Sequence, residues 1–166
     1  YNSQVHHSAT GSGTFEHLTA GPTTLLDPTG EGTVGSAVKD SAIVAAARAA
    51  GIPVETVPQL VAIAGDSNSK AQTEAKTILR ERAVVLGEAV SSLVGLFNPT
   101  RVVLGGQAFT DYPDTLNLIA SLIHQNSTDV DIRVTAARGR VQQQAAAAVA
   151  ITAVAYDPLH AVEGAR

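Results

Sequence analysis

The chain of 166 residues contains no cysteine, no methionine and no tryptophan. Without cysteine it can form neither a disulfide nor a zinc site with thiolate ligands, and this excludes a secreted scaffold held together by disulfides. Because methionine is absent and the first residue is Tyr1, we expect the chain to be a piece of a longer protein.

Positive charge and long apolar runs are also scarce. The formal net charge is −4, the isoelectric point is near 5.7, and the charged residues are scattered along the chain. Such a chain lacks the basic surface that holds a nucleic-acid backbone, so we do not expect it to bind DNA by itself. No apolar run approaches a membrane span and no signal-peptide pattern stands at the start, so we expect a soluble, cytoplasmic protein with no membrane partner.

The clearest pattern is a long helix followed at once by a strand. From Ala75 onward apolar residues return at steps of three and four, which is typical of the buried face of an α-helix. These residues are Ile78, Leu79, Val85, Leu86, Ala89, Val90, Leu93, Val94 and Phe97. Asn98-Pro99 should end the helix, because proline cannot continue it. The β-branched run 101–104 then predicts a short buried strand that ends at Gly105–Gly106, where open α/β sheets bind ligands.

The same helix contains Gly87 and Gly95. Each glycine costs about 1 kcal/mol relative to alanine in a helix, which predicts that another element approaches closely at both positions. Asp66 or Ser67 is predicted to cap the helix. Its charged side is expected to face water and consists of Lys70, Glu74, Lys76, Arg80, Glu81 and Arg82.

The remaining sequence divides into two parts. Residues 1–35 are rich in Ser, Thr, Gly and His and predict a loop-rich segment with one short helix at 14–20. Residues 36–166 predict an α/β lobe. Its other expected elements are a helix from a Ser36 cap to Ala50, a helix over Val57–Ala64 with Pro58 in its first turn, a turn over 108–114, a helix over 115–125, a half-exposed strand over 131–135 and an Ala-rich helix over 141–156.

Two features look like binding motifs but do not predict a site. Residues 30–35 match G-x-G-x-x-G, yet the turn-forming residues 27–29 precede them where a dinucleotide site needs a strand, so a flexible loop is favoured. His6 and His7 are adjacent and cannot share one metal ion, and His17, His124 and His160 are isolated, so we predict no metal site.

One stretch resembles a known family. Leu86-Gly87 and the run Leu93-Val-Gly-Leu-Phe-Asn-Pro-Thr-Arg-Val-Val-Leu-Gly-Gly106 resemble the signature in the C-terminal half of the ROK family of sugar kinases and sugar-responsive repressors. The resemblance covers roughly residues 9–160. It implies an α/β fold in which long helices pack on a small sheet, as the C-terminal part of an actin-like (RNase H-type) domain. It also implies that Gly105 and Gly106 belong to the adenosine side of a nucleotide site.

The family's zinc motif is degenerate here. Where the family has three cysteines, this chain has His7, Ala9 and Thr14. Alanine cannot ligate a metal and threonine is a poor zinc ligand, so we expect no zinc and no other cofactor. Gly13 and Glu16 do match, and the resemblance implies that the Glu16 carboxylate accepts hydrogen bonds from sugar hydroxyls. The alternative is that Glu16 is a surface charge in the first turn of a short helix.

The resemblance favours a sugar-sensing module of a ROK-type transcriptional regulator, which binds a sugar or sugar phosphate and forms a homo-oligomer. DNA would be bound only through a winged helix in a part outside this chain. Such a regulator needs no phosphoryl transfer and tolerates eroded motifs. One alternative is a sugar kinase, which would use ATP and would need a base Asp and a phosphate loop before Tyr1. Another is a degenerate module kept for oligomerisation. No catalytic residue is identified in this chain.

Overall fold

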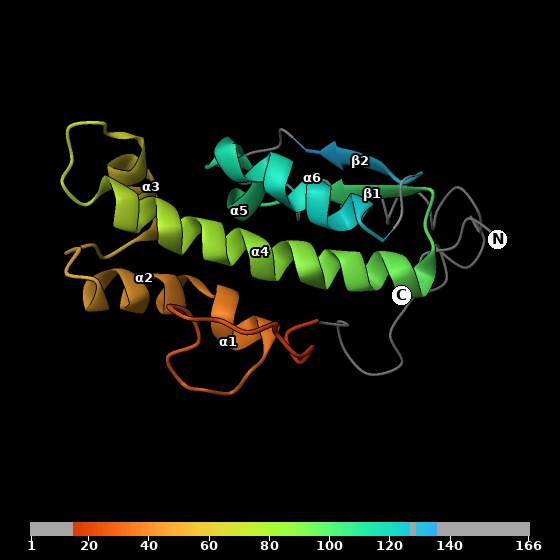
Figure 1. Ribbon diagram of the computed structural model, residues 1–166, viewed down its shortest axis with the longest axis horizontal. Helices are drawn as coiled ribbons and strands as arrows, with labels where there is room; N and C mark the ends of the chain where they lie inside the picture. The colour runs from red at the N-terminus through yellow and green to blue at the C-terminus, as the bar shows by residue number, and fades with distance from the viewer. Residues whose placement is uncertain (1–14, 127–128, 136–166) are drawn as a thin grey trace, which may run out of the picture.

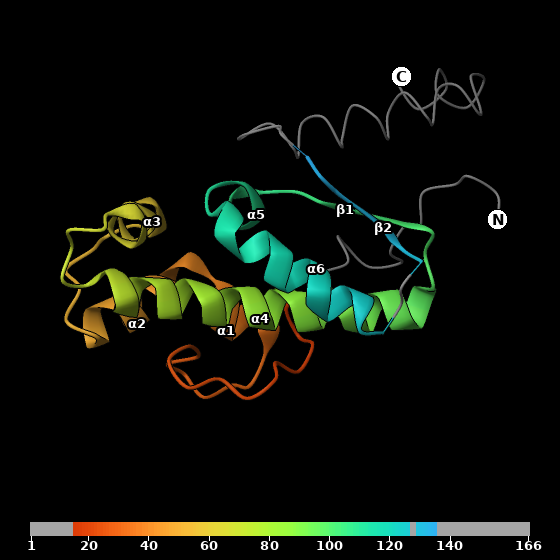
Figure 2. The same ribbon diagram turned by 45° about the horizontal axis from the view of Figure 1, so that its top comes forward.

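A 26-residue helix, α4 (Gln72–Phe97), runs the length of the structure, and the other elements pack along it (Figure 1). The computed structural model describes residues 15–126 and 129–135. In Figure 1 α1 and α2 follow one side of α4, whereas α6 and the sheet lie on the other, and in Figure 2 α1 and α2 pass partly behind α4. Besides α4, the elements are α1 (Val34–Val38), α2 (Asp40–Ala49), α3 (Val57–Gly65), β1 (Arg101–Leu104), α5 (Gln107–Thr110), the 3-10 helix η1 (Pro113–Thr115), α6 (Leu116–His124) and β2 (Asp131–Val134).

The two strands form a small parallel sheet. Arg101 pairs with Asp131 and Leu104 pairs with Val134, and the crossover between the strands contains α5, η1 and α6. Helices combined with a parallel sheet confirm the expected α/β class. The strand at 101–104 was expected to be buried, but Val103 is 63% exposed to solvent among the described residues. Of the four residues of β1, Leu104 alone is buried.

Two separate apolar clusters hold these elements together on α4. The first joins the segment before α1, the helices α1 to α3 and the first half of α4, and its most buried members include Ala37, Ile43, Leu60 and Ile78. The second joins the later part of α4 to β1, α6 and the start of β2, through Val94, Leu104, Ile119, Ile123 and Val130. Burying an Ile or Leu side chain contributes about 1.5–3 kcal/mol, so both clusters stabilise the position of α4.

The long helix α4 ends just before Pro99, as the sequence predicted. Asn98 adopts a left-handed conformation with φ of 43°, and its N–H donates to the carbonyl of Val94 at 2.8 Å, so the helix closes before Pro99. The beginning differs from the expectation, because Ala71 occupies the N-cap position and makes no side-chain cap. Asp66 instead accepts from the N–H of Asn68, directly after α3. Phe97, expected on the buried face, is 65% exposed among the described residues.

The helix predicted from Ser36 to Ala50 is two helices. Thr33, and not Ser36, is the N-cap of α1, and Ser36 forms the other half of a capping box with it. The backbone then turns out of the helical region at Lys39, where ψ is 146°, and α2 starts at Asp40. The predicted start of α3 is confirmed, because Thr56 caps it and a proline stands in its first turn.

Other predictions have mixed outcomes. The helix at 115–125 and the strand at 131–135 are confirmed as α6 and β2 within one residue at each end. The short helix at 14–20 is wrong for residues 15–20, which form turns and an antiparallel bridge between Thr19 and Thr33. The turn predicted at 108–114 mostly contains α5 and the start of η1. The Ala-rich helix at 141–156 lies outside the described residues.

Candidate ligand-binding segment

Glu16, the predicted sugar-binding residue, begins a loop that returns to α1. The loop is closed at its base by three backbone hydrogen bonds: Gly35 N–H to Glu16 at 2.9 Å, Val34 N–H to Leu18 at 2.8 Å, and Ala20 N–H to the Gly32 carbonyl at 2.9 Å. We call residues 16–35 the Glu16 loop. Residues 16–20 and 32–35 therefore lie side by side, and Glu16 has a defined place beside the start of α1.

The Glu16 carboxylate is open to solvent on this loop. Its Oε2 lies 3.3 Å from Nζ of Lys39, and both side chains are more than half exposed. An exposed ion pair of this kind contributes about 0–1 kcal/mol, so little energy opposes a ligand that rearranges it. The carboxylate can accept hydrogen bonds from two neighbouring hydroxyls of one ligand. Lys39 adds a cation that can donate to the same ligand.

Three glycines of the loop are explained by its geometry and not by phosphate binding. Gly30 and Gly32 have φ of 68° and 66°, a left-handed conformation that side chains rarely adopt. A Cβ atom on Gly35 would lie 2.9 Å from Cβ of Glu16, so only glycine allows this close approach. The residues before Gly30 form a turn, which confirms that residues 30–35 are not preceded by the strand of a dinucleotide site.

Asp27 organises the tip of the Glu16 loop. Its carboxylate accepts from the N–H of Gly32 at 2.7 Å, from the N–H of Glu31 at 3.3 Å and from the hydroxyl of Thr29 at 3.0 Å. These hydrogen bonds, that of Gly32 foremost, hold the pKa of Asp27 below its ordinary value. The carboxylate is thus committed to the loop itself.

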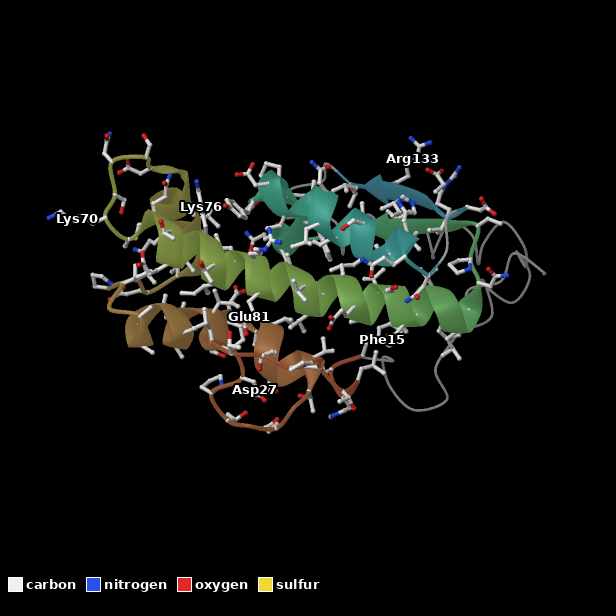
Figure 3. All side chains as sticks on the ribbon, in the orientation of Figure 1. Phe15, Asp27, Lys70, Lys76, Glu81 and Arg133 are labelled. Atoms are coloured by element: carbon white, nitrogen blue, oxygen red, sulfur yellow. The ribbon has the colours of Figure 1, made fainter. Side chains whose placement is uncertain are left out.

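Glu81 joins the Glu16 loop to the long helix. Its carboxylate accepts hydrogen bonds from the backbone N–H groups of Thr24, Leu25 and Leu26, and from the Thr24 hydroxyl at 3.0 Å. In Figure 3 the Glu81 side chain lies on the side of α4 that faces the loop containing Asp27. Burial raises the pKa of Glu81, but the hydrogen bonds from Leu25 and Thr24 outweigh burial and hold the pKa below its ordinary value.

The position of Glu81 corrects a prediction from the sequence, which had this residue facing water. Its position on the polar side of the helix was read correctly, but that side is covered by a loop far away in the chain. Thr24 and Glu81 are separated by 57 residues. No periodicity reports such a contact, so sequence reasoning had no signal for it.

Arg82 was also expected to face water, and this too is wrong. Its side chain is 14% exposed, and its terminal nitrogen lies 2.8 Å from Oδ1 of Asp40 at the start of α2. The Arg82 Nε atom is buried and has no hydrogen-bond partner among the described residues. Arg82 lines a cavity of about 30 Å³, together with residues such as Leu79, Gln107 and Tyr112. A cavity of this size holds a water molecule but no sugar.

The two glycines after β1 lie in a different place. Gly106 has φ of 109°, and no atom of the described residues stands within 4 Å of the position its Cβ would take. Gly105 lines a groove between β1 and the end of α4, together with apolar residues such as Leu93, Phe97 and Phe109. An apolar groove with open backbone can receive a flat ring, which is compatible with the predicted adenosine side of a nucleotide site.

The structure therefore does not bring the predicted residues into one pocket. The Glu16 loop and the β1–α5 connection lie on opposite sides of α4 in both views (Figures 1 and 2). Within residues 15–126 and 129–135 there is no group of three or more His, Cys, Asp or Glu side chains that could hold a metal ion. The degenerate zinc positions His7, Ala9 and Thr14 lie outside the described residues. In the same ranges no helix is long and apolar enough to cross a membrane.

The chain is similar to three curated mycobacterial proteins, each named as a transcriptional regulator. One is from Mycobacterium bovis and two are from strains of Mycobacterium tuberculosis, and each is 37% identical over 173 residues. The match covers 96% of this chain but only 38% of each relative, so the chain spans well under half of the length of these proteins. No family model matches the chain. No solved structure matches it either.

Proposed function

We propose that this chain is the ligand-sensing part of a ROK-type transcriptional regulator, and that Glu16 binds the hydroxyls of a sugar or sugar phosphate. The observation that carries the proposal is the 37% identity, over nearly the whole chain, to proteins named as transcriptional regulators. The sequence from Leu86 to Gly106, with its resemblance to sugar-responsive repressors, supplies the ligand class.

The charge of the chain supports a division of labour within the regulator. A net charge of −4 and a small number of scattered basic residues give this part no surface suited to the phosphate backbone. DNA is then bound by another part of the longer protein, and this part reports the ligand. The relatives have room for such a part, because the match covers only 38% of their length.

The Glu16 loop supports the choice of binding residue. Its base is fixed by backbone hydrogen bonds, so the backbone that carries Glu16 is held in place before a ligand arrives, and this preorganisation reduces the entropy cost of binding. The same carboxylate is more than half exposed, and its contact with Lys39 is accessible to solvent. It can thus exchange that contact for sugar hydroxyls.

The test uses the full-length protein and DNA from the region upstream of its own gene. Fluorescence anisotropy of the labelled DNA should report binding, and one member of a panel of hexoses and hexose 6-phosphates should change the affinity at least severalfold. The 166-residue chain alone should leave the anisotropy unchanged at the same salt concentration. If the full-length protein does not bind this DNA, or if no sugar of the panel alters binding, the proposal is wrong.

A further inference from the structure

We propose that Glu81 is the positioning residue of the sugar site: it holds the Glu16 loop against α4 so that the Glu16 carboxylate is in place for the ligand. This inference rests on the proposed function. Glu81 itself does not touch the ligand, and its effect passes through the backbone of the loop.

The first observation is the number of hydrogen bonds that converge on one carboxylate. Three successive backbone N–H groups, from Thr24 to Leu26, and one hydroxyl point at Glu81. A carboxylate suits this role because both oxygens accept, whereas a glutamine has only one accepting oxygen and would present its NH₂ group to some of these donors. Hydrogen bonds to a charged group are also about twice as strong as neutral ones.

The second observation is the path from Glu81 to Glu16. Residues 16–20 are fixed to residues 32–35 by the three backbone hydrogen bonds at the base of the loop, and the second of these stretches continues into α1. The loop is connected to α4 by the stretch from Gly21 to Leu26. Leu26 is buried in the first apolar cluster, and a Cβ on Gly21 would meet the Glu88 carboxylate.

Glu81 and Glu88 are seven residues apart, so they lie on the same face of the helix, about 10 Å from each other along its axis. Gly21 to Leu26 therefore runs along about two turns of α4, and within the described part of the chain its hydrogen bonds to side chains of that helix are those to Glu81. Without the Glu81 carboxylate, residues 16–26 would keep their apolar contacts through Leu18, Ala20 and Leu26 but lose their polar attachment to α4. Residues 16–20 would then sample more positions, and ligand binding would have to restrict these positions again.

The experiment measures sugar affinity by calorimetric titration of the full-length protein, with the sugar that changes DNA binding. Glu81→Gln should weaken binding about fivefold, because a displaced carboxylate loses part of its alignment with the hydroxyls. Glu81→Asp keeps the charge and should weaken binding less. Glu74→Gln, an exposed change of the same kind on the same helix, should leave the affinity unchanged.

A loss of stability alone is separated from positioning by a second control. Ile123→Val removes a methyl group from the fully buried second cluster, across α4 from the loop, and should lower the melting temperature without changing sugar affinity. Hydrogen exchange should become faster in residues 21–26 of Glu81→Gln but not in those of Ile123→Val. Together with the weakened binding, this pattern supports the inference.

Two results would overturn the inference and leave the proposed function intact. One is wild-type affinity in Glu81→Gln, and the other is an equal loss of affinity in Ile123→Val at the same drop in melting temperature. A wild-type protein that binds no sugar overturns the proposed function and this inference with it. The two failures are distinguished by the wild-type titration.

Discussion

Gly87 of α4 lies directly against Leu122 of α6. A Cβ atom on Gly87 would come within 2.7 Å of Cδ1 and 3.2 Å of Cβ of Leu122, so any side chain at position 87 would force Leu122 or its helix to shift. One turn later the Ser91 hydroxyl donates to the Leu122 carbonyl at 3.0 Å and accepts from the Asn126 side chain at 2.8 Å. The long helix is thus joined to α6 by two small residues spaced four apart.

Gly87→Ala is therefore expected to destabilise the protein although alanine is the better helix former. The propensity gain is about 1 kcal/mol. Overpacking costs about 1–3 kcal/mol, so the net change should be a loss. Gly95→Ala is the matched control, because no described atom lies within 4 Å of its Cβ position, and it should stabilise by up to about 1 kcal/mol. Urea denaturation followed by circular dichroism measures both, and equal stability of the two variants would refute the close contact at Gly87.

The hydrogen bonds of Glu81 predict a pH-dependent contribution to stability. Its folded-state pKa lies below the ordinary value of 4.5, so its contribution is fully present above that pH and is lost as the pH falls through the lowered pKa. Wild type should exceed Glu81→Gln by about 1 kcal/mol near neutral pH, given the partial exposure of the group. The two stabilities should converge in acid. A difference that stays constant down to pH 3 would contradict the prediction, and Glu74→Gln provides the baseline.

Glu16→Gln should weaken sugar binding by about tenfold, because the charge-assisted hydrogen bonds become neutral ones. The melting temperature should hardly change, since the carboxylate is exposed and its ion pair with Lys39 contributes little. Calorimetric titration of the full-length protein measures the affinity. Glu31→Gln, an exposed change in the same loop, is the control. Unchanged affinity in Glu16→Gln would make Glu16 a simple surface charge.

The protein should contain no structural zinc. His7, Ala9 and Thr14 stand where the zinc motif of the ROK family has three cysteines, and one imidazole cannot hold the ion alone. Elemental analysis of protein purified without added metal should find far less than one zinc per chain. A stoichiometric zinc content would show that other residues provide the ligands.

The chain alone should not phosphorylate hexoses with ATP. The base and phosphate-binding loop that a kinase needs are expected outside it, and the Glu16 loop and the β1–α5 connection lie on opposite sides of α4 (Figures 1 and 2). A coupled assay over a panel of hexoses should give only background. Turnover that disappears in Gly106→Asp would reverse the order of the regulator and kinase hypotheses.

The sequence by itself determined the features that depend on neighbours in the chain. The end of α4 at Asn98, the strand that follows and the start of α3 were all predicted, because proline, β-branched runs and capping residues act within a few positions. The residue types of residues 1–35 likewise predicted a loop-rich segment, and residues 21–33 contain no helix. These signals are local, and the tertiary structure only confirmed them.

Tertiary contacts decided the features that depend on distant residues. Positions 87 and 95 of α4 are both glycine. Among the described residues, however, a neighbouring helix lies against Gly87 and no atom lies within 4 Å of the position that a Cβ on Gly95 would take. Glu81 and Arg82 belong to one polar run, yet one holds a loop and the other pairs with Asp40. Helical periodicity tells which side of α4 a residue occupies, but the packing of the whole chain decides what covers that side, because partners such as Thr24 lie 57 residues away.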